Sequence, residues 1–375
     1  MTDLNAPPRA DFGASGPAAA PAGQDIDLKV RCSQTAYRWA SRTFDARAGK
    51  SGAVDRRLNA SFASILAIGG KRVGITSDGI GTKVEVAERT GVYSTLGYDL
   101  LAMVADDLAS NGIEPTNLTN ILDVDRLDER VVGDLLSGLS QACLESGIAV
   151  VGGEIAELGR RVGGWGGGMH FNWCATAVGV LPDELASPID GASCAPGDVI
   201  VAVREHGLRS NGFSLARAVL ADAHGERWHE ARCQATGESW GAALLTPSRV
   251  CCTLVRSLVK EGVVPHGIAH ITGGGVPDKL GRVLKVRKLG ASIETPFEPP
   301  AFVQELIELG KVPAQKAWRH WNMGNAMLLL LAPGDVERTL AVAAHGFEAR
   351  VAGHVEEGSR IRIAHAGETV ETEVK

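Results

Sequence analysis

The sequence predicts an α/β (α+β) fold built from two domains. The chain has 375 residues, more than the ~100–200 residues of one typical domain. Short apolar strands alternate with amphipathic helices along it, which favours an α/β or α+β body over a helical bundle or a sandwich. A polar, turn-rich stretch over 182–198 interrupts this alternation. We therefore expect an N-terminal domain over 26–182 and a C-terminal α/β domain over 183–375, preceded by a disordered tail over 1–25.

The composition narrows the class of protein. Lys and Arg total 38 and Asp and Glu total 44, so the net charge is 38 − 44 = −6, which argues against general nucleic-acid binding. The longest apolar run, 326–332, is far shorter than the ~20 residues of a membrane-spanning helix. The N-terminus lacks the apolar stretch of a secretion signal, and the seven cysteines include no C-x-x-C pair. These features predict a cytoplasmic protein without disulfides, structural zinc or a membrane partner.

The N-terminal unit alternates strand-like and helix-like segments. Four short apolar segments are typical of strands: 72–77, 118–124, 148–151 and 175–181. Two longer segments repeat apolar residues every three or four positions and predict helices: 98–111 and 128–146. Residues 161–168 hold five glycines around Trp165 and predict an exposed loop that can order over a ligand. Residues 26–66 show no clear period and receive no element.

The C-terminal unit opens with an apolar strand over 199–203 and closes its core with another over 326–331. Between them, Ser210-Asn211-Gly212 is typical of a helix start. Three glycines over 273–275 precede Pro277, a residue favoured in the first turn of a helix, so free backbone N–H groups are expected there. This segment is a candidate anion site, although a plain glycine-rich turn fits the pattern as well.

Charged residues stand at the ends of three predicted N-terminal elements. Asp78 begins the turn 78–83 after the first strand, Asp107 lies near the end of a helix, and Glu154 follows Gly152-Gly153. Glycines and a lysine at a strand end can meet phosphate through N–H groups and a cation, and carboxylates suit Mg²⁺. The turn matches neither a P-loop nor a dinucleotide fingerprint. A structural turn, and a solvent-facing Asp106-Asp107 pair, therefore remain alternatives.

Seven short motifs follow one another along the chain. They are Thr76–Lys83, Gly97–Leu100 with Asp107-Leu108 and Gly112–Pro115, Val151–Glu157, Ser210–Gly212, Leu245–Arg249, His270–Gly275 and Trp321–Gly324. One of these motifs alone has little specificity. Together and in this order, over about 73–351, they resemble the aminoimidazole ribonucleotide synthetase family, the phosphoribosylformylglycinamidine cyclo-ligases.

The resemblance implies a fold and a reaction. The family's PurM-like fold has two α/β domains, and strands of two N-terminal domains join in a dimer barrel, so a homodimer is implied. The reaction is an ATP-dependent ring closure in purine biosynthesis. ATP activates the formamide oxygen of formylglycinamidine ribonucleotide as an iminophosphate, the amidine nitrogen attacks that carbon, and phosphate leaves. ATP and Mg²⁺ are the implied cofactors, and the ribonucleotide is the implied substrate.

The resemblance also assigns roles to residues. The implied metal and nucleotide carboxylates are Asp78, Asp107 and Glu154, which together with Lys83, a phosphate partner, form the implied catalytic set. Further nucleotide contacts are implied at Gly79, Gly81, Thr82, Gly152 and Gly153. Ribonucleotide contacts are implied at Asn211, Thr272, Gly273, Gly274, Gly275 and Asn322.

The chain departs from the family pattern at four places. Residues 44–66 hold only two glycines, where the family carries a glycine-rich ATP lid with a lysine. Arg209 stands where the family often has histidine, and a permanent cation cannot act as a general base near neutral pH. Asn172 replaces a common aspartate, and 158–165 replaces a Met-Pro-Gly pattern. These departures keep two alternatives open: a paralogue that uses the same ATP chemistry on another amide or acceptor, and a non-catalytic nucleotide-binding dimer.

Overall fold

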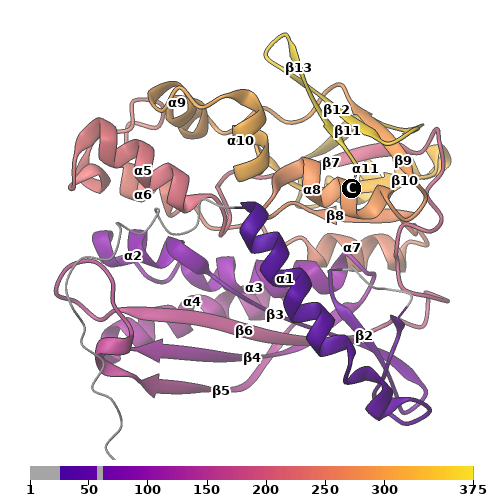
Figure 1. Cartoon of the computed structure of the whole chain (residues 1–375), viewed down its shortest axis with the longest axis horizontal. Coiled ribbons are helices and arrows are strands. Elements are labelled where there is room, and N and C mark those ends of the chain that lie inside the picture. Colours follow the sequence, from indigo (N-terminus) through magenta and orange to yellow (C-terminus); the bar gives the residue numbers. More distant parts are fainter. Residues whose placement is uncertain (1–25, 57–61, 375) are drawn as a thin grey trace, which may run out of the picture.

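Two β-sheets organise the structure, a computed structural model that describes residues 26–56 and 62–374 (Figure 1). The first sheet has six strands in the order β1-β2-β3-β6-β4-β5, and the second has seven in the order β13-β12-β9-β11-β7-β10-β8. Helices pack on and between the sheets. This mixed architecture confirms the predicted α/β (α+β) class, whereas the predicted tail over 1–25 lies outside the described residues.

The first sheet is mostly antiparallel. Its strands are β1 (Ala53–Val54), β2 (Ser64–Ile68), β3 (Lys71–Gly79), β4 (Glu114–Val124), β5 (Ala149–Glu157) and β6 (Phe171–Val180). Only β4 and β5 pair in parallel. The associated helices are α2 (Val84–Thr90), α3 (Leu96–Ala109) and α4 (Glu129–Ser146). The strands and helices predicted in this region are confirmed, with shifted ends.

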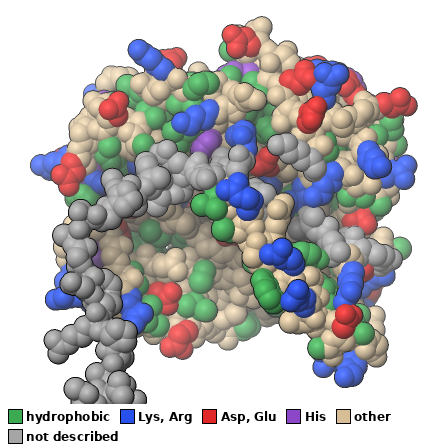
Figure 2. Space-filling model, in the orientation of Figure 1, with side chains coloured by type: hydrophobic (Ala, Val, Ile, Leu, Met, Phe, Trp, Pro, Cys, Tyr) green, Lys and Arg blue, Asp and Glu red, His purple; other side chains and the backbone are tan. Residues whose placement is uncertain are grey.

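The two faces of this sheet differ. Along β6 the side chains alternate between buried and at least partly exposed, because α3 covers one face and leaves the other open. A Cβ at Gly74 would lie 2.8 Å from Leu108 of α3, which marks the covered face. The opposite face is hollowed and carries scattered hydrophobic side chains (Figure 2). The strand register places Ile68, Ile121 and Val180 on this open face, and all three are exposed large hydrophobic residues.

One strand was predicted too short. The sequence predicted a strand over 148–151 closed by a turn at Gly152-Gly153, but β5 continues through both glycines to Glu157. They stay extended because they pair with Thr119 and Asn120 of β4. A Cβ at Gly153 would lie 2.5 Å from the carbonyl oxygen of Asn120, so this glycine permits close strand packing rather than a turn.

The segment without a predicted element contains regular structure. Helix α1 (Ile26–Ser41) and the short 3₁₀ helix η1 (Phe44–Arg47) precede β1. Figure 1 shows α1 running diagonally across the view. Residues 31–40 of this helix are all exposed. A helix that buries no stripe against the body need not carry the apolar period that sequence reasoning depends on.

The second sheet contains two completely buried strands, β8 and β10. Its strands are β7 (Val199–Arg204), β8 (Gly267–His270), β9 (Leu289–Ile293), β10 (Asn325–Leu331), β11 (Ala349–Glu357), β12 (Arg360–His365) and β13 (Glu368–Glu373). Every residue of β10 is buried, since it lies between β7 and β8. The strands predicted at 199–203 and 326–331 are confirmed.

Seven helices accompany the second sheet. They are α5 (Phe213–His224), α6 (Trp240–Leu244), α7 (Cys252–Lys260), α8 (Gly275–Leu284), α9 (Ala301–Leu309), α10 (Ala314–His320) and α11 (Val336–Ala343). The helix predicted after Gly212 is confirmed as α5. Helix α8 begins at Gly275, before the predicted start at Pro277, because positive φ angles at Gly274 and Gly275 complete the turn earlier.

The two halves share one interior. Helix α3 contacts β3 and β6 of the first sheet and α7 of the second half. Buried apolar residues from Phe62 to Val370 belong to one continuous cluster. The division into domains at 182/183 therefore stays a prediction. Within the described residues, no helix is both long and apolar enough to span a membrane.

Candidate active site between the two sheets

The turn after β3 exposes a carboxylate and two small residues. Asp78 is the next-to-last residue of β3, and its Oδ1 accepts a hydrogen bond from the N–H of Gly79 at 2.7 Å. Gly81 has φ +65° and opens a 3₁₀ turn that leads into α2. Gly81 and Thr82 are exposed. Both residues are therefore accessible to a ligand, and nucleotide contacts by Gly79, Gly81 and Thr82 stay a prediction.

Lys83 of the same turn points into the protein. Its ammonium group is fully buried, lies 2.6 Å from Oδ2 of Asp99, and donates to the carbonyl of Thr246 at 2.8 Å. Oδ1 of Asp99 in turn accepts from the hydroxyl of Ser248 at 2.5 Å. Lys83 thus forms a buried ion pair within the first half and joins it to the second half through the hydrogen bond to Thr246. These contacts do not support a phosphate-binding Lys83, and that role stays a prediction.

A second buried ionic cluster surrounds Arg209. Its guanidinium lies 2.7 Å from Asp106 and 3.0 Å from Glu205, and all three side chains are fully buried. Oδ1 of Asp106 accepts the N–H groups of Cys251 and Cys252 at 2.8 Å, at the start of α7. Burial opposes the charge of Arg209, but the two carboxylates outweigh that effect and raise its pKa. The alternative that Asp106 faces solvent is therefore wrong.

Asp107 has a different environment from its neighbour. Its side chain is 17% exposed, and Oδ1 lies 2.8 Å from Nδ1 of His270 on β8. Burial raises the pKa of Asp107 to about 7, against the opposing charges of Lys279 and Arg282. Burial and the nearby charge of Arg209 lower the pKa of His270 well below its usual range. Asp107 is therefore the predicted carboxylate that lies where the two halves meet.

Two cations on α8 were missed by the sequence reasoning. Lys279 and Arg282 lie three residues apart, and both pack over the ring of Phe62, at 5.9 and 4.8 Å from its centre. Burial and the neighbouring guanidinium lower the pKa of Lys279 to about 8, while the charges of Asp107, Asp278 and Asp78 oppose that shift. Their i, i+3 spacing, one turn after a glycine-rich helix start, was the available signal.

The glycine-rich segment forms a tight turn at the start of α8. The N–H of Gly275 binds the carbonyl of Thr272 at 2.9 Å. A Cβ at Gly273 would lie 2.9 Å from Oδ1 of Asn211, and one at Gly275 would lie 1.8 Å from the carbonyl oxygen of Trp318. The structure thus brings Asn211 against the turn, and contact of both with the ribonucleotide stays a prediction.

Asn322 belongs to a different part of the interior. Its Nδ2 donates to the carbonyl of Gly207 at 2.9 Å, and its Oδ1 accepts the N–H of Gly324 at 2.8 Å. The side chain is buried. These contacts shape the loop before β10. They do not support ribonucleotide binding by Asn322, which stays a prediction.

Glu154 lies apart from the other predicted carboxylates. Directly paired residues point to the same face of a sheet. Asp78 pairs with buried Ala175, whereas Glu154 pairs with Ile121, which is 47% exposed, so the two carboxylates point to opposite faces. Two strands separate β3 from β5, which puts their backbones ~14 Å apart at ~4.8 Å per strand.

The geometry of one chain does not support a single metal centre built from all three carboxylates, and their roles as metal ligands stay predictions. Mg²⁺ holds its ligands at about 2.0–2.1 Å, and side chains on opposite faces of a sheet do not converge on such an ion. Among the residues that the structure describes, no group of three or more His, Cys, Asp or Glu side chains is placed to hold a metal. Separate roles for Asp78, Asp107 and Glu154 stay predictions.

The glycine-rich loop around Trp165 contacts both halves of the molecule. The backbone N–H of Trp165 donates to a carboxylate oxygen of Glu88 at 2.9 Å, and the centre of the Trp165 ring lies 4.9 Å from that of the His229 ring. Arg89 packs over the same indole ring at 4.9 Å. The predicted exposed loop is confirmed in its glycines, but its tryptophan is fixed against protein.

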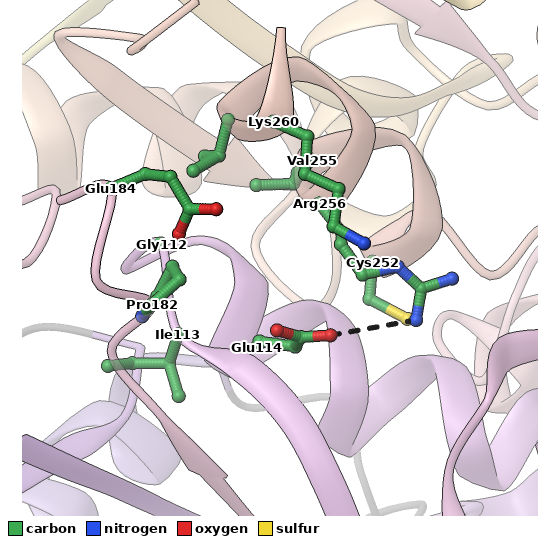
Figure 3. Close-up of a pocket in the computed structure, with 10 residues that line it drawn as sticks. Gly112, Ile113, Glu114, Pro182, Glu184, Cys252, Val255, Arg256 and Lys260 are labelled. Atoms are coloured by element: carbon green, nitrogen blue, oxygen red, sulfur yellow. Dashed lines mark ion pairs between the residues drawn. The ribbon is translucent and has the colours of Figure 1, made fainter. Parts of the chain in front are cut away.

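A separate pocket opens elsewhere on the molecule (Figure 3). It lies between the start of β4, the segment after β6, and α7, and an ion pair of 3.8 Å joins Glu114 and Arg256 within it. Its lining residues are Gly112, Ile113, Glu114, Pro182, Glu184, Cys252, Val255, Arg256, Val259 and Lys260. None of the predicted site residues lines it, so this pocket is separate from the candidate site.

Solved structures define the fold class. The chain is similar to HypE in a HypE–HypF complex, with a TM-score of 0.59 and 16% identity over 84% of this chain and 93% of that chain. It is also similar to a structure titled "AaThiL complexed with AMPPCP and TMP", with a TM-score of 0.56 and 16% identity. That match covers 84% of this chain and 90% of the other chain. The class is therefore the two-domain PurM-like α/β fold.

Sequence comparisons define the family. The family models of the AIR synthase related protein match residues 61–181 with the N-terminal domain and residues 195–366 with the C-terminal domain. A phosphoribosylformylglycinamidine cyclo-ligase of Carboxydothermus hydrogenoformans is 36% identical over 76% of this chain and 81% of its own length. The phosphoribosylformylglycinamidine cyclo-ligase of Thermococcus kodakarensis is 34% identical over 93% of this chain and 98% of its own length. The chain belongs to the AIR synthase family, which confirms the resemblance.

Proposed function

We propose that the protein closes the imidazole ring of aminoimidazole ribonucleotide, using ATP and formylglycinamidine ribonucleotide and releasing ADP and phosphate. One observation carries the proposal: a curated cyclo-ligase shares 34% of its residues with this chain over 93% of the chain and 98% of its own length. ATP as the nucleotide is supported by structures of similar fold whose titles name ATP and AMPPCP. The reaction belongs to cytoplasmic purine biosynthesis.

The residues between the two sheets suit two phosphorylated ligands. Nucleotide phosphates would meet the exposed turn of Gly81 and Thr82 beside Asp78. The ribonucleotide phosphate would lie at the start of α8, where Lys279 and Arg282 add positive charge. Bringing two partly desolvated cations together is unfavourable without an anion, and a phosphate dianion relieves that repulsion.

The chain's main contribution to the reaction is positioning. The formamide oxygen must approach the terminal phosphoryl group of ATP in line, and the amidine nitrogen must then reach the activated carbon. Backbone N–H groups of the turn at Gly81 and Thr82 would stabilise the charge that develops on the transferred phosphoryl group. The carboxylate of Asp107, fixed by His270, would orient the ligands between the halves.

Magnesium would reach this site with the nucleotide. Mg²⁺ is commonly held by one or two carboxylates together with substrate phosphates, and the exposed Asp78 and the partly exposed Asp107 fit that requirement. When bound, the ion would offset phosphate charge. The arrangement does not provide a preformed cage of three carboxylates, so we expect little metal binding without ATP.

A homodimer formed through the first sheet would give Glu154 a place in the proposed function. The open face of this sheet carries exposed Ile68, Ile121 and Val180, and Glu154 points to that same face. Pairing two such faces would remove apolar surface from water. Glu154 would then act at the interface between protomers rather than beside Asp78 of its own chain.

The direct test is mass spectrometry of the products. Purified protein, Mg²⁺, ATP and formylglycinamidine ribonucleotide should give ADP and aminoimidazole ribonucleotide in equal amounts, and Asp107→Asn should reduce both. Absence of product from folded protein that binds ATP would contradict the proposal. ADP release screened over other amides would then identify a redirected paralogue.

A further inference from the structure

Three side chains form a continuous hydrogen-bonded chain between the two halves. Nη2 of Arg209 lies 2.8 Å from Nε2 of His270, and Nδ1 of the same ring lies 2.8 Å from Oδ1 of Asp107. Arg209 and His270 are fully buried. The chain therefore runs from the interior of the second half to Asp107, a predicted site carboxylate at the junction between the halves.

The chemistry of the arginine determines where the histidine proton lies. A guanidinium group has only donors and keeps its proton in proteins, so Nε2 of His270 must accept. The ring then carries its proton on Nδ1, where it is donated to Oδ1 of Asp107. A histidine between a fixed donor and a carboxylate has one tautomer that satisfies both neighbours.

Arg209 is itself held on several sides. It contacts Asp106 at 2.7 Å and Glu205 at 3.0 Å, and it donates to the carbonyl of Arg249 at 2.9 Å. Its backbone has φ +58°, a conformation uncommon for a residue other than glycine. Such a residue persists where the surroundings determine its position. The guanidinium therefore presents a fixed donor to the imidazole.

We propose that Arg209 is a positioning residue that holds His270 as the Nδ1–H tautomer, so that His270 orients the carboxylate of Asp107 toward the site between the sheets. The histidine is then a fixed donor and not a proton carrier, because both of its nitrogens are engaged. The importance of Asp107 for turnover rests on the proposed function. The tautomer of His270 does not.

The first test observes the tautomer directly. Nitrogen NMR of ligand-free protein labelled at histidine should show His270 with a protonated Nδ1 and an unprotonated Nε2, assigned by loss of its signals in His270→Asn. Protonation at Nε2, or at both nitrogens, would overturn the proposal. This measurement needs no substrate, so it stands even if cyclisation is not observed.

A charge-balanced variant tests the part played by the arginine. Removing Arg209 alone would leave two buried carboxylates without their cation, so Arg209→Met is combined with Asp106→Asn and Glu205→Gln, and the single variants Asp106→Asn and Glu205→Gln are the controls. The triple variant should lose the uniform Nδ1–H signal, while the controls should keep it. An unchanged tautomer in the folded triple variant would show that Arg209 does not determine it.

A matched pair of histidine variants tests the link to turnover. In His270→Asn the side-chain amide can still donate near the position of Nδ1, whereas His270→Gln moves the amide toward the position of Nε2. The asparagine variant should stay within a few-fold of wild type in kcat/KM, and the glutamine variant should lose about 10- to 100-fold, as for other groups that orient a ligand residue. Equal, severe losses in both variants would instead indicate proton transfer by His270.

Discussion

Three aspartates of α3 show how environment separates residues of one type. Asp99 pairs with Lys83, Asp106 with Arg209, and Asp107 with His270. Only Asp107 retains exposure, at 17%. The sequence could select Asp107 through a motif, but it could not assign Asp106, whose partner lies 103 positions away. Lys83 was predicted to bind phosphate because it ends a glycine-rich turn. Its buried partner Asp99 lies outside that turn, so the local sequence did not reveal the ion pair.

The cation Lys279 is expected to lower the stability of the ligand-free protein. Its pKa is lowered to about 8, first by burial and then by Arg282, so the unfolded state binds more protons between about pH 8 and 10. Lys279→Met should therefore raise the free energy of unfolding by about 1–3 kcal/mol at pH 7. This advantage should shrink as the pH rises through 8 toward 10. Urea unfolding across this pH range measures it.

The same substitution should harm ligand binding. Lys279→Met is expected to raise the KM for the ribonucleotide by about 10-fold or more, the loss of one charge-assisted hydrogen bond. The control is Lys285→Met, which removes an exposed cation just after the same helix. If Lys279→Met and Lys285→Met change the free energy of unfolding and the KM by the same amounts, Lys279 has no special role in either property.

The two candidate ligand sites should respond to different substitutions. Asp78→Asn or Asp107→Asn should mainly reduce kcat/KM for Mg-ATP, by about 10- to 100-fold, because these carboxylates are the proposed ligands of the magnesium ion that ATP brings. Thr272→Val should mainly raise the KM for the ribonucleotide. Steady-state kinetics with each substrate varied in turn tests this division. Equal effects of all three variants on both substrates would contradict it.

At the scale of elements, apolar patterns predicted six of the thirteen described strands, those of β3 to β7 and β10, and missed the other seven. The strands 199–203 and 326–331 carry continuous apolar runs because they lie inside the second sheet. β5 was cut short because two glycines resemble a turn, although pairing with β4 keeps them extended. Helix α1 gave no period because its described side chains face outward. Local hydrophobic patterns indicate which residues are buried, but they do not reveal contacts with residues that are distant in the sequence.

Close packing of α4 against the segment before α3 depends on one glycine. A Cβ at Gly138 would lie 1.8 Å from the carbonyl oxygen of Ser94, whereas one at Gly133 of the same helix meets nothing within 4 Å. Gly138→Ala should therefore destabilise the fold by about 2–4 kcal/mol through overpacking. Gly133→Ala should stabilise it by about 0.5–1 kcal/mol, because alanine favours helix. Thermal unfolding of the two variants checks both signs, and a similar loss in both would contradict the packing argument.

At the scale of the whole molecule, the open face of the first sheet predicts the state of association. Ile121 is 47% exposed on that face, while Leu144 is 74% exposed on α4. In a dimer formed through the sheet, Ile121→Glu would bury a charge without a partner, and the dissociation constant should rise more than 10-fold. Leu144→Glu should leave it unchanged. Analytical ultracentrifugation distinguishes the two, and a wild-type monomer at all concentrations would refute the dimer.

The buried cluster around Arg209 also constrains how this protein can vary between lineages. One guanidinium pairs with the carboxylates of Asp106 and Glu205, all of them fully buried. Loss of Arg209 would leave two carboxylates in the interior without their cation, whereas loss of either carboxylate leaves a one-to-one ion pair. Evolutionary change at position 209 to a residue that cannot carry a positive charge is therefore expected only after the carboxylates have been replaced. In related sequences, an uncharged residue at position 209 should occur together with uncharged residues at positions 106 and 205.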